Sequence, residues 1–270
     1  MLSRRSNVGR VRGERWTDVV SGVVRIGVAF YCASGVTRML HALIIGAAGW
    51  SSAAQLLVTV LDVVASVLVL RAWRGGDVLA CALSVWRVSV VLWMIAGRYF
   101  VVEGDDVGEL AMKTAPLTAM VWLACWSREA RASYRAMIHG GRGVQIVWWA
   151  CGSWGWSMAA GAVEIWFLAA SGSMTMPVPM WLIVTSGLAG AGVVVCALNG
   201  LMGRHLVTVA WGCATCAVVS GAATAVEWCM QEAPGGSKLF LLGAAHVIVF
   251  VCGSAAAMRA RRRAVADAKY

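Results

Sequence analysis

Eight stretches of this chain are apolar over about 18 residues or more, the length that an α-helix needs to cross the hydrocarbon of a bilayer. Inside hydrocarbon every backbone amide and carbonyl must find a partner within the protein, so runs of this length are helices. They lack the alternation of polar and apolar residues that is typical of a membrane β-barrel. The sequence therefore predicts an all-α, polytopic membrane protein with transmembrane helices near 18–36, 53–70, 77–97, 108–126, 144–171, 178–200, 205–227 and 239–258.

Composition agrees with this class. The 270-residue chain is 60% hydrophobic, only 13% charged and contains 4 prolines, so little of it is expected to face water. A net charge of +10 is high enough to suggest nucleic acid as a partner. However, no basic face with interleaved aromatic residues lies outside the apolar stretches, and we expect no nucleic-acid partner.

The distribution of basic residues predicts the orientation of the chain. If successive loops alternate sides, seventeen basic residues fall on the side of the two termini and three on the other, with Arg25, Arg87 and Lys113 inside spans. By the positive-inside rule, both termini lie in the cytoplasm, and the protein is integral to the cytoplasmic (inner) membrane. Arginine-rich segments on that side attract anionic lipid head groups, so anionic membrane lipids are expected partners.

The second half of the chain matches the first half in one ungapped register of 126 residues. In this register 33–38 meets 159–164, and 56–59 meets 182–185. We therefore expect two four-helix repeats. Because four is an even number, the repeats share one orientation and are related by a pseudo-two-fold axis along the membrane normal. The expected units are the first repeat (1–126), a basic cytoplasmic linker (127–143), the second repeat (144–258) and a basic cytoplasmic tail (259–270).

Glycine and tryptophan positions indicate how the helices pack. Small residues let helices approach closely in lipid, so the glycines of 144–171 and 178–200 mark places where helices meet. Tryptophans far from the ends of spans are expected in the core or lining a cavity, and these are Trp86, Trp93, Trp154, Trp156 and Trp211.

Three charged residues fall toward the middle of the first three spans: Arg25, Asp62 and Arg87. A charge at the bilayer centre costs about 2.5–3.5 kcal/mol on insertion scales, so we expect Asp62 to pair with one of the two arginines. The three residues form either a structural clamp or an intramembrane polar site for an anion or a proton. The second repeat has Leu188 and Cys151 in place of Asp62 and Arg25, so any central site is asymmetric.

A second polar group is expected toward the outer face, and its members are Arg38, His41, Lys113 and Glu164. Arg38 and Glu164 occupy equivalent places in the two repeats and carry opposite charge. We predict that they meet, or nearly meet, as a contact between the repeats. A structural ion pair and a contact with substrate are the two alternatives for this group.

Cys213 and Cys216 form a CxxC motif in the seventh span. A redox role would require an accessible thiolate, whereas nine cysteines scattered through apolar runs are typical of ordinary small apolar residues. A single CxxC is not a zinc site, and the four histidines are not spaced for haem. The sequence predicts no metal site and identifies no cofactor.

The first half of the chain resembles the DoxX-like family of four-helix membrane proteins. The resemblance covers about 18–126 and rests on five residues in order, Arg25, Gly35, Arg38, Asp62 and Arg74. The second half departs from this pattern, with Glu164 at the basic position and Leu188 at the acidic one. The resemblance implies a small membrane subunit linked to quinone- or thiol-coupled redox chemistry.

Charged residues buried in lipid usually mark a pathway or a binding site. The leading interpretation is a multi-pass membrane protein that binds or transports a small lipophilic or anionic molecule through a polar intramembrane cavity. The alternative is a non-catalytic or quinone- or thiol-linked accessory subunit of a membrane complex. Neither interpretation requires the chain to be an enzyme.

Overall fold

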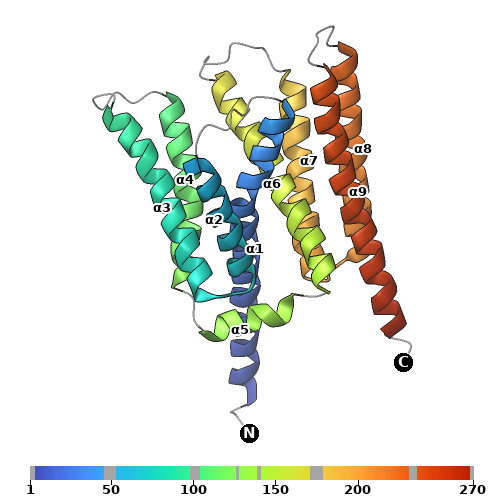
Figure 1. Ribbon diagram of the computed structural model, residues 1–270. Coiled ribbons are helices and arrows are strands. Elements are labelled where there is room, and N and C mark those ends of the chain that lie inside the picture. The colour runs from blue at the N-terminus through green and yellow to red at the C-terminus, as the bar shows by residue number, and fades with distance from the viewer. Residues whose placement is uncertain are drawn as a thin grey trace.

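The computed structural model describes residues 4–45, 53–97, 104–125, 128–138, 141–170, 179–230 and 236–267. These residues contain helices and no strand, which confirms the all-α prediction. The long helices lie side by side and the short α5 crosses one end of them (Figure 1). In chain order the helices are α1 (Arg4–Ile45), α2 (Ala53–Leu70), α3 (Arg74–Gly97), α4 (Gly104–Ala124), α5 (Arg128–Met137), α6 (Arg142–Ala170), α7 (Met180–Leu201), α8 (Leu206–Met230) and α9 (Gly236–Asp267).

Five segments of the described residues are long and apolar enough to cross a membrane: Val19–Leu40, Arg74–Gly97, Met180–Leu201, Leu206–Val226 and Gly243–Ala266. A shorter apolar helix covers Leu57–Leu70. Large apolar side chains point outward from α2, α3, α7, α8 and α9, as expected where a helix faces lipid rather than water. By helix length and composition the chain is an integral membrane protein with several spans.

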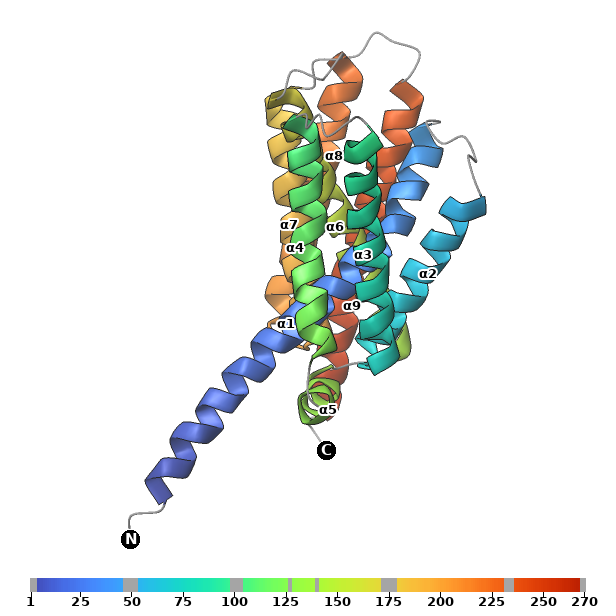
Figure 2. The same cartoon turned by 90° about the vertical axis from the view of Figure 1, so that its left-hand side faces the viewer.

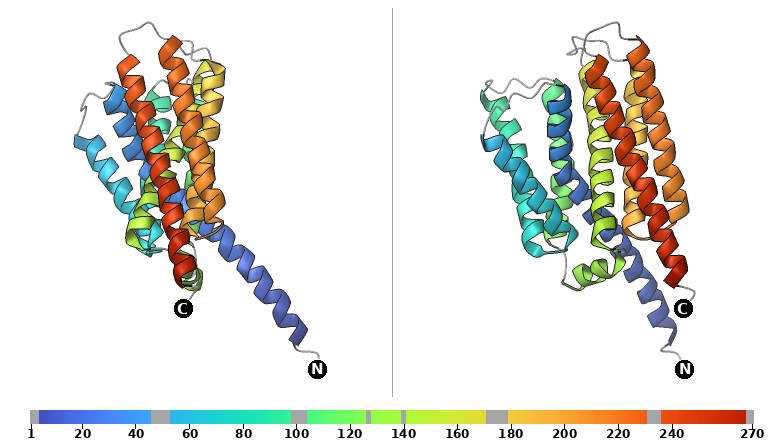
Figure 3. Two further views of the ribbon diagram at one scale, coloured as in Figure 1. Left: turned by 90° about the vertical axis from the view of Figure 1, so that its right-hand side faces the viewer. Right: turned by 45° about the vertical axis from the view of Figure 1, so that its right-hand side comes forward.

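The helices form two groups that are consecutive in the chain. In the first group α1, α2, α3 and α4 each pack on the next helix, and α4 also returns to α1. In the second group α6, α7, α8 and α9 pack in the same order, and α9 returns to α6. The largest contact between the groups joins α1 to α6, and the two groups stand side by side (Figures 1 and 3).

Both described ends of the chain lie at one end of the bundle, which we name the terminal end. Helix α5 crosses this end, and the first turns of α1 project beyond the bundle on the same side (Figure 2). At the opposite end lie the last turns of α1, α3, α6 and α8 and the first turns of α2, α4, α7 and α9 (Figure 1). Segments that join the two groups therefore meet at the terminal end.

Small residues account for the closest helix contacts. A Cβ atom added to Gly190 of α7 would lie 2.6 Å from the carbonyl oxygen of Gly155 in α6, so only glycine permits this approach. A Cβ atom added to Gly152 of α6 would lie 2.2 Å from the ring of Phe30 in α1. The expectation that glycines mark helix contacts is confirmed at Gly152, Gly155 and Gly190, whereas nothing lies within 4 Å of a Cβ atom added to Gly161. Phe30 belongs to the same apolar cluster as Trp148 of α6, so the core continues from one group into the other.

The five mid-span tryptophans divide into two sets. Trp154 is buried and Trp156 is half-buried, in agreement with the sequence prediction. Trp86, Trp93 and Trp211 point outward instead, and Trp93 and Trp211 are 76% and 73% exposed. Lipid tails are as apolar as the protein core, so no solvent force drives a mid-span indole ring inward. The prediction that these three line a core or cavity is wrong.

Candidate functional site

The buried charges of the first helix group form two separate ion pairs. Arg87 of α3 donates a hydrogen bond to Asp62 of α2. Arg25 of α1 pairs with Asp77, in the first turn of α3. The structure thus brings Asp62 and Arg87 together as expected, and it places Arg25 in a different pair with an acidic residue that the sequence reading did not single out.

The Arg25–Asp77 pair is bidentate. Nη1 of Arg25 lies 2.7 Å from Oδ1 of Asp77, and Nη2 lies 2.9 Å from Oδ2. Nη1 also donates to the carbonyl oxygen of Val69 at 2.9 Å. Both side chains are 0% exposed. Paired and hydrogen-bonded in this way, the two charges are satisfied within the bundle, so the pair is a structural clamp between α1, α2 and α3.

Helix α5 closes this clamp from the terminal end. The guanidinium carbon of Arg25 lies 5.5 Å from the ring centroid of Tyr134, a cation–π contact. Nη1 of Arg131 lies 3.7 Å from Oδ2 of Asp77. Burial raises the pKa of the Tyr134 phenol above its ordinary value, and the nearby Arg25 charge partly opposes this effect. The phenol therefore stays neutral at any physiological pH.

Local sequence explains why Asp77 reaches this position. A helix N-terminus carries a partial positive charge, so an acidic residue in the first turn of α3 is favourable there. Gly76 precedes it, and a Cβ atom at Gly76 would lie 2.4 Å from the Cβ of Leu68. Glycine therefore lets the start of α3 pack directly against the end of α2.

The sequence predicted Arg25 near the middle of its span, and there is a geometric reason why it lies closer to the terminal end. The first span was expected at 18–36, which puts Arg25 near its middle, but the apolar segment runs over Val19–Leu40 within a helix that continues to Ile45. The middle of the span is therefore displaced toward the opposite end, and Arg25 lies at the depth of Val69. An acidic residue at the first position of the predicted third span was the signal that could have found Asp77.

The Asp62–Arg87 pair lies farther from the terminal end than the Arg25–Asp77 pair does. Asp62 is 2% exposed, and the Arg87 side chain is 17% exposed. The guanidinium carbon of Arg87 lies 5.4 Å from the ring centroid of Tyr31 in α1. Gly35 lies beside the carboxylate oxygen that accepts from Arg87, since a Cβ atom at Gly35 would lie 3.1 Å from Oδ2 of Asp62. Tyr31 and Gly35 of α1 therefore complete the site.

This second pair leaves hydrogen-bonding atoms unused. Oδ1 of Asp62 and Nη1 of Arg87 have no hydrogen-bond partner among the described residues. One turn before Arg87, the hydroxyl of Ser84 is also buried and lacks a partner in this part of the chain. A carboxylate accepts several hydrogen bonds and a guanidinium donates five, so the pair retains one acceptor and one donor for another molecule. We name Tyr31, Gly35, Asp62, Ser84 and Arg87 the polar site.

Hydrogen bonds connect the neighbourhood of the polar site to the second helix group. The indole nitrogen of Trp149 in α6 donates to the hydroxyl of Ser66 at 2.8 Å. Ser66, one helical turn after Asp62, donates in turn to the carbonyl oxygen of Ala29 at 2.6 Å. A movement of α6 against α1 would therefore alter the hydrogen bonds of Ser66, one helical turn from Asp62.

The residues predicted near the outer face are only partly described. Lys113 donates to Glu109 one turn earlier on its own helix α4, rather than joining a group from both halves. Arg38 is exposed near the opposite end of α1. The side chains of His41 and Glu164 lie outside the described residues. The predicted contact between Arg38 and Glu164 therefore stays a prediction.

The CxxC cysteines face α7. Cys213 is buried, and its sulfur is in hydrogen-bonding contact with Cys196 of α7. The half-buried Cys216 lies beside Gly192, whose added Cβ atom would be 3.1 Å from the Cys216 sulfur. Every described cysteine is a free thiol, and no cluster of three or more metal-ligating side chains is found in the described part of the chain.

The described geometry thus supplies one bidentate clamp, one incompletely satisfied polar site and one pair of neighbouring thiols. In the polar site a buried donor of Arg87 and a buried acceptor of Asp62 have no partner among the described residues. Comparison with known proteins adds no family: no family model matches the chain, and no curated protein and no solved structure matches it.

Proposed function

We propose that this chain is an eight-span protein of the cytoplasmic membrane, built from two four-helix repeats with both termini in the cytoplasm. The identical packing order of α1–α4 and α6–α9 supports the repeats. The basic residues near Arg71, in α5 and at the end of α9 support the orientation, because all of them lie at the terminal end. In this arrangement 127–143 is the linker between repeats and 259–270 is a basic tail.

We further propose that the polar site binds a small molecule, either for retention or for passage through the bundle. The observation that carries this proposal is the contrast between the two buried ion pairs. Arg25 and Asp77 use both carboxylate oxygens and both terminal guanidinium nitrogens on each other. Asp62 and Arg87 use one of each. Since unsatisfied buried polar atoms are costly, the second arrangement indicates a ligand rather than a clamp.

The unused atoms define the chemistry of that ligand. Nη1 of Arg87 donates, so it suits a carbonyl, carboxylate or phosphate oxygen, while Oδ1 of Asp62 accepts, so it suits a hydroxyl or amine. The surrounding residues Val28, Ala29 and Cys32 are buried and apolar. A small lipophilic molecule with an acceptor next to a donor, or a lipophilic acid, fits both features.

Thermal unfolding of the purified protein in detergent tests this proposal. The probes are a series of medium-chain carboxylic acids and short-chain quinones. We expect at least one probe to raise Tm of the wild type and to lose this effect in Asp62→Asn and in Arg87→Gln. Glu109→Gln, which breaks the ion pair on the surface of α4, is the matched control and should keep the response.

A clamp would behave differently. If Asp62→Asn lowers stability, Arg87→Gln in the same chain restores it, and no probe shifts Tm of the wild type, then the pair has a structural role. That set of results would remove the binding proposal. It would leave the eight-span arrangement untouched, because the two proposals depend on different observations.

The second candidate is a thiol- or quinone-linked accessory subunit, the role that the resemblance to DoxX-like proteins implies. The contact between Cys196 and Cys213 favours it, because two neighbouring thiols can be oxidised to a disulfide. Alkylation mass spectrometry of intact and chemically reduced membranes tests this idea. A disulfide that joins Cys213 to Cys196 or Cys216 supports it, whereas fully reduced cysteines in both samples eliminate thiol chemistry.

A further inference from the structure

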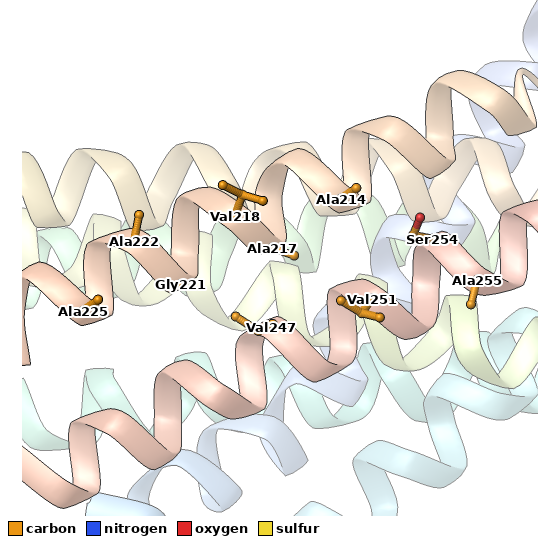
Figure 4. Close-up of a pocket in the computed structure, with 10 residues that line it drawn as sticks. All are labelled: Ala214, Ala217, Val218, Gly221, Ala222, Ala225, Val247, Val251, Ser254 and Ala255. Atoms are coloured by element: carbon orange, nitrogen blue, oxygen red, sulfur yellow. The ribbon is translucent and has the colours of Figure 1, made fainter.

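A groove of about 840 Å³ runs between α8 and α9 on the outside of the second helix group (Figure 4). Its walls are formed by small apolar side chains, among them Ala214, Val218 and Ala222 of α8 and Val251 and Ala255 of α9. Val218 and Val251 are 71% and 51% exposed, so the hollow is open to the surroundings of the bundle. It lies along helices that are long and apolar enough to cross the membrane.

Positive charge continues the groove toward the terminal end. Helices α8 and α9 run antiparallel, since Thr224 lies against Gly243 and Gly221 lies against Val247. On α9 the groove-lining face passes from Val251 to Arg262 by three helical turns, and Arg261 flanks the same face. The antiparallel register sets these two arginines level with the first turn of α8. Both are exposed.

The start of α8 adds to this charge. Arg204, exposed in the turn between α7 and α8, lies two residues before Leu206 at the N-terminus of α8, where the helix dipole is also positive. The groove is therefore apolar along its length and cationic at one mouth. This order, apolar then positive at the membrane surface, matches a phospholipid acyl chain that ends in an anionic head group.

We propose that the groove binds one acyl chain of an anionic phospholipid, whose phosphate lies against Arg204, Arg261 and Arg262. A second transmembrane helix is the competing occupant. It would have to place an acidic segment at the same mouth, and with its side chains it is about 10–12 Å wide, a poor match to a groove lined by alanine, glycine, valine and Ser254. The lipid fits both the shape and the charge.

Native mass spectrometry of the full-length protein in detergent tests the assignment. The probes are dioleoyl phosphatidylglycerol and dioleoyl phosphatidylcholine, which have the same chains and differ in head-group charge. We expect one phosphatidylglycerol to be retained in preference to phosphatidylcholine. The variant R261Q/R262Q should weaken the binding of phosphatidylglycerol roughly 30-fold, because two arginine contacts with the anionic head group are lost. The variant A222L/A255L, which fills the groove, should also abolish the binding of phosphatidylglycerol.

Matched controls make the result specific. The variant R74Q/R128Q removes the same charge from exposed positions of α3 and α5, and A82L/A96L adds the same bulk to exposed positions of α3. Both should retain the lipid as the wild type does. Equal retention of the two lipids, unchanged binding by R261Q/R262Q, or an equal loss in R74Q/R128Q would overturn the proposal. So would a dimer that A222L/A255L dissociates, because the occupant would then be a second copy of the chain.

Discussion

Arg25 and Asp77 show at the residue scale how this chain tolerates charge in an apolar bundle. Each terminal guanidinium nitrogen faces a carboxylate oxygen, and Val69 supplies a further acceptor. Removal of one partner of such a buried pair leaves an uncompensated charge, which typically costs 3–5 kcal/mol, whereas replacement of both by apolar residues is often neutral or favourable. Loss of one partner should therefore destabilise the fold more than replacement of both.

The first prediction follows from this asymmetry. Asp77→Asn should lower the free energy of unfolding by about 3 kcal/mol or more, because it strands the Arg25 charge. The double variant Arg25→Met with Asp77→Leu should recover most of the loss. Thermal unfolding in detergent measures both. If Asp77→Asn unfolds at the wild-type temperature, the clamp contributes nothing to stability.

Gly35 and Gly27, two glycines of α1, provide a second prediction. A Cβ atom at Gly35 would press on the Asp62 carboxylate at 3.1 Å, whereas nothing lies within 4 Å of one at Gly27. Gly27→Ala should stabilise by about 0.5–1 kcal/mol through helix propensity. Gly35→Ala should be less stable than Gly27→Ala by roughly 1–2 kcal/mol, because the carboxylate must move. Equal unfolding temperatures would contradict this close contact.

Individual site residues differed in how far the sequence could predict them. Asp62 and Arg87 were identifiable because a charge deep in an apolar span has few possible partners. Tyr31 and Gly35 were not, since an aromatic ring or a glycine in a span has many ordinary roles. Asp77 stood at the boundary of a span, where an acidic residue is not unusual. That Arg25 lies beside it could not be predicted, because α1 continues beyond the predicted end of its span.

At the scale of elements, α5 is held against the first helix group by its arginines. Arg135 donates from Nε to the carbonyl oxygen of Arg71 at 3.1 Å and from Nη2 to that of Ala72 at 3.0 Å. These two carbonyls follow the end of α2, and Ala72 adopts a left-handed conformation with φ 52°. Arg135 therefore caps α2 from a distant part of the chain.

The third prediction concerns this cap. Arg135→Ala should increase the rate at which a protease cleaves the 127–143 segment in native protein, because α5 loses two hydrogen bonds to the end of α2. Arg142→Ala removes an exposed arginine inside the same segment, at the first residue of α6, and is the control. Limited proteolysis followed by mass spectrometry of the fragments gives both rates. Equal cleavage of the two variants would show that Arg135 does not fasten α5.

The contact between α1 and α6 provides the fourth prediction. Gly152→Val should destabilise the protein by about 1–3 kcal/mol, because the added side chain overlaps the ring of Phe30. Shortening the partner with Phe30→Ala should relieve the clash, so Gly152→Val should cost less in that background. A double-mutant cycle of unfolding temperatures measures the coupling. Additive effects would mean that α1 and α6 do not meet at these residues.

The ends of the elements were less predictable than their existence. The first span was expected to end at residue 36, but α1 continues to Ile45, and the tail expected after residue 258 continues α9 to Asp267. In the second case the cause is local propensity: 255–266 is rich in alanine and arginine, both strong helix formers. Hydropathy reports where the membrane ends, whereas helix propensity decides where the helix ends.

At the scale of the whole molecule, the 126-residue register and the packing order agree. The register aligns α1 with α6 and α2 with α7, and these helices occupy the same places in their groups. The contact of α1 with α6 was not predictable, because in lipid many faces of a helix are equally apolar. The polar site lies in the first group only, since Leu188 stands in the second at the place of Asp62 and points outward.

The proposed topology sets the depth of Asp62 in the membrane and the side of the membrane on which the lipid at the end of α9 lies. Reporter fusions at Gly104, Gly140 and Gly172, two of which lie outside the described residues, measure it most directly. An eight-span chain with cytoplasmic termini predicts a periplasmic signal at Gly104 and Gly172 and a cytoplasmic signal at Gly140. A cytoplasmic signal at Gly104 or Gly172, or a periplasmic one at Gly140, would contradict it.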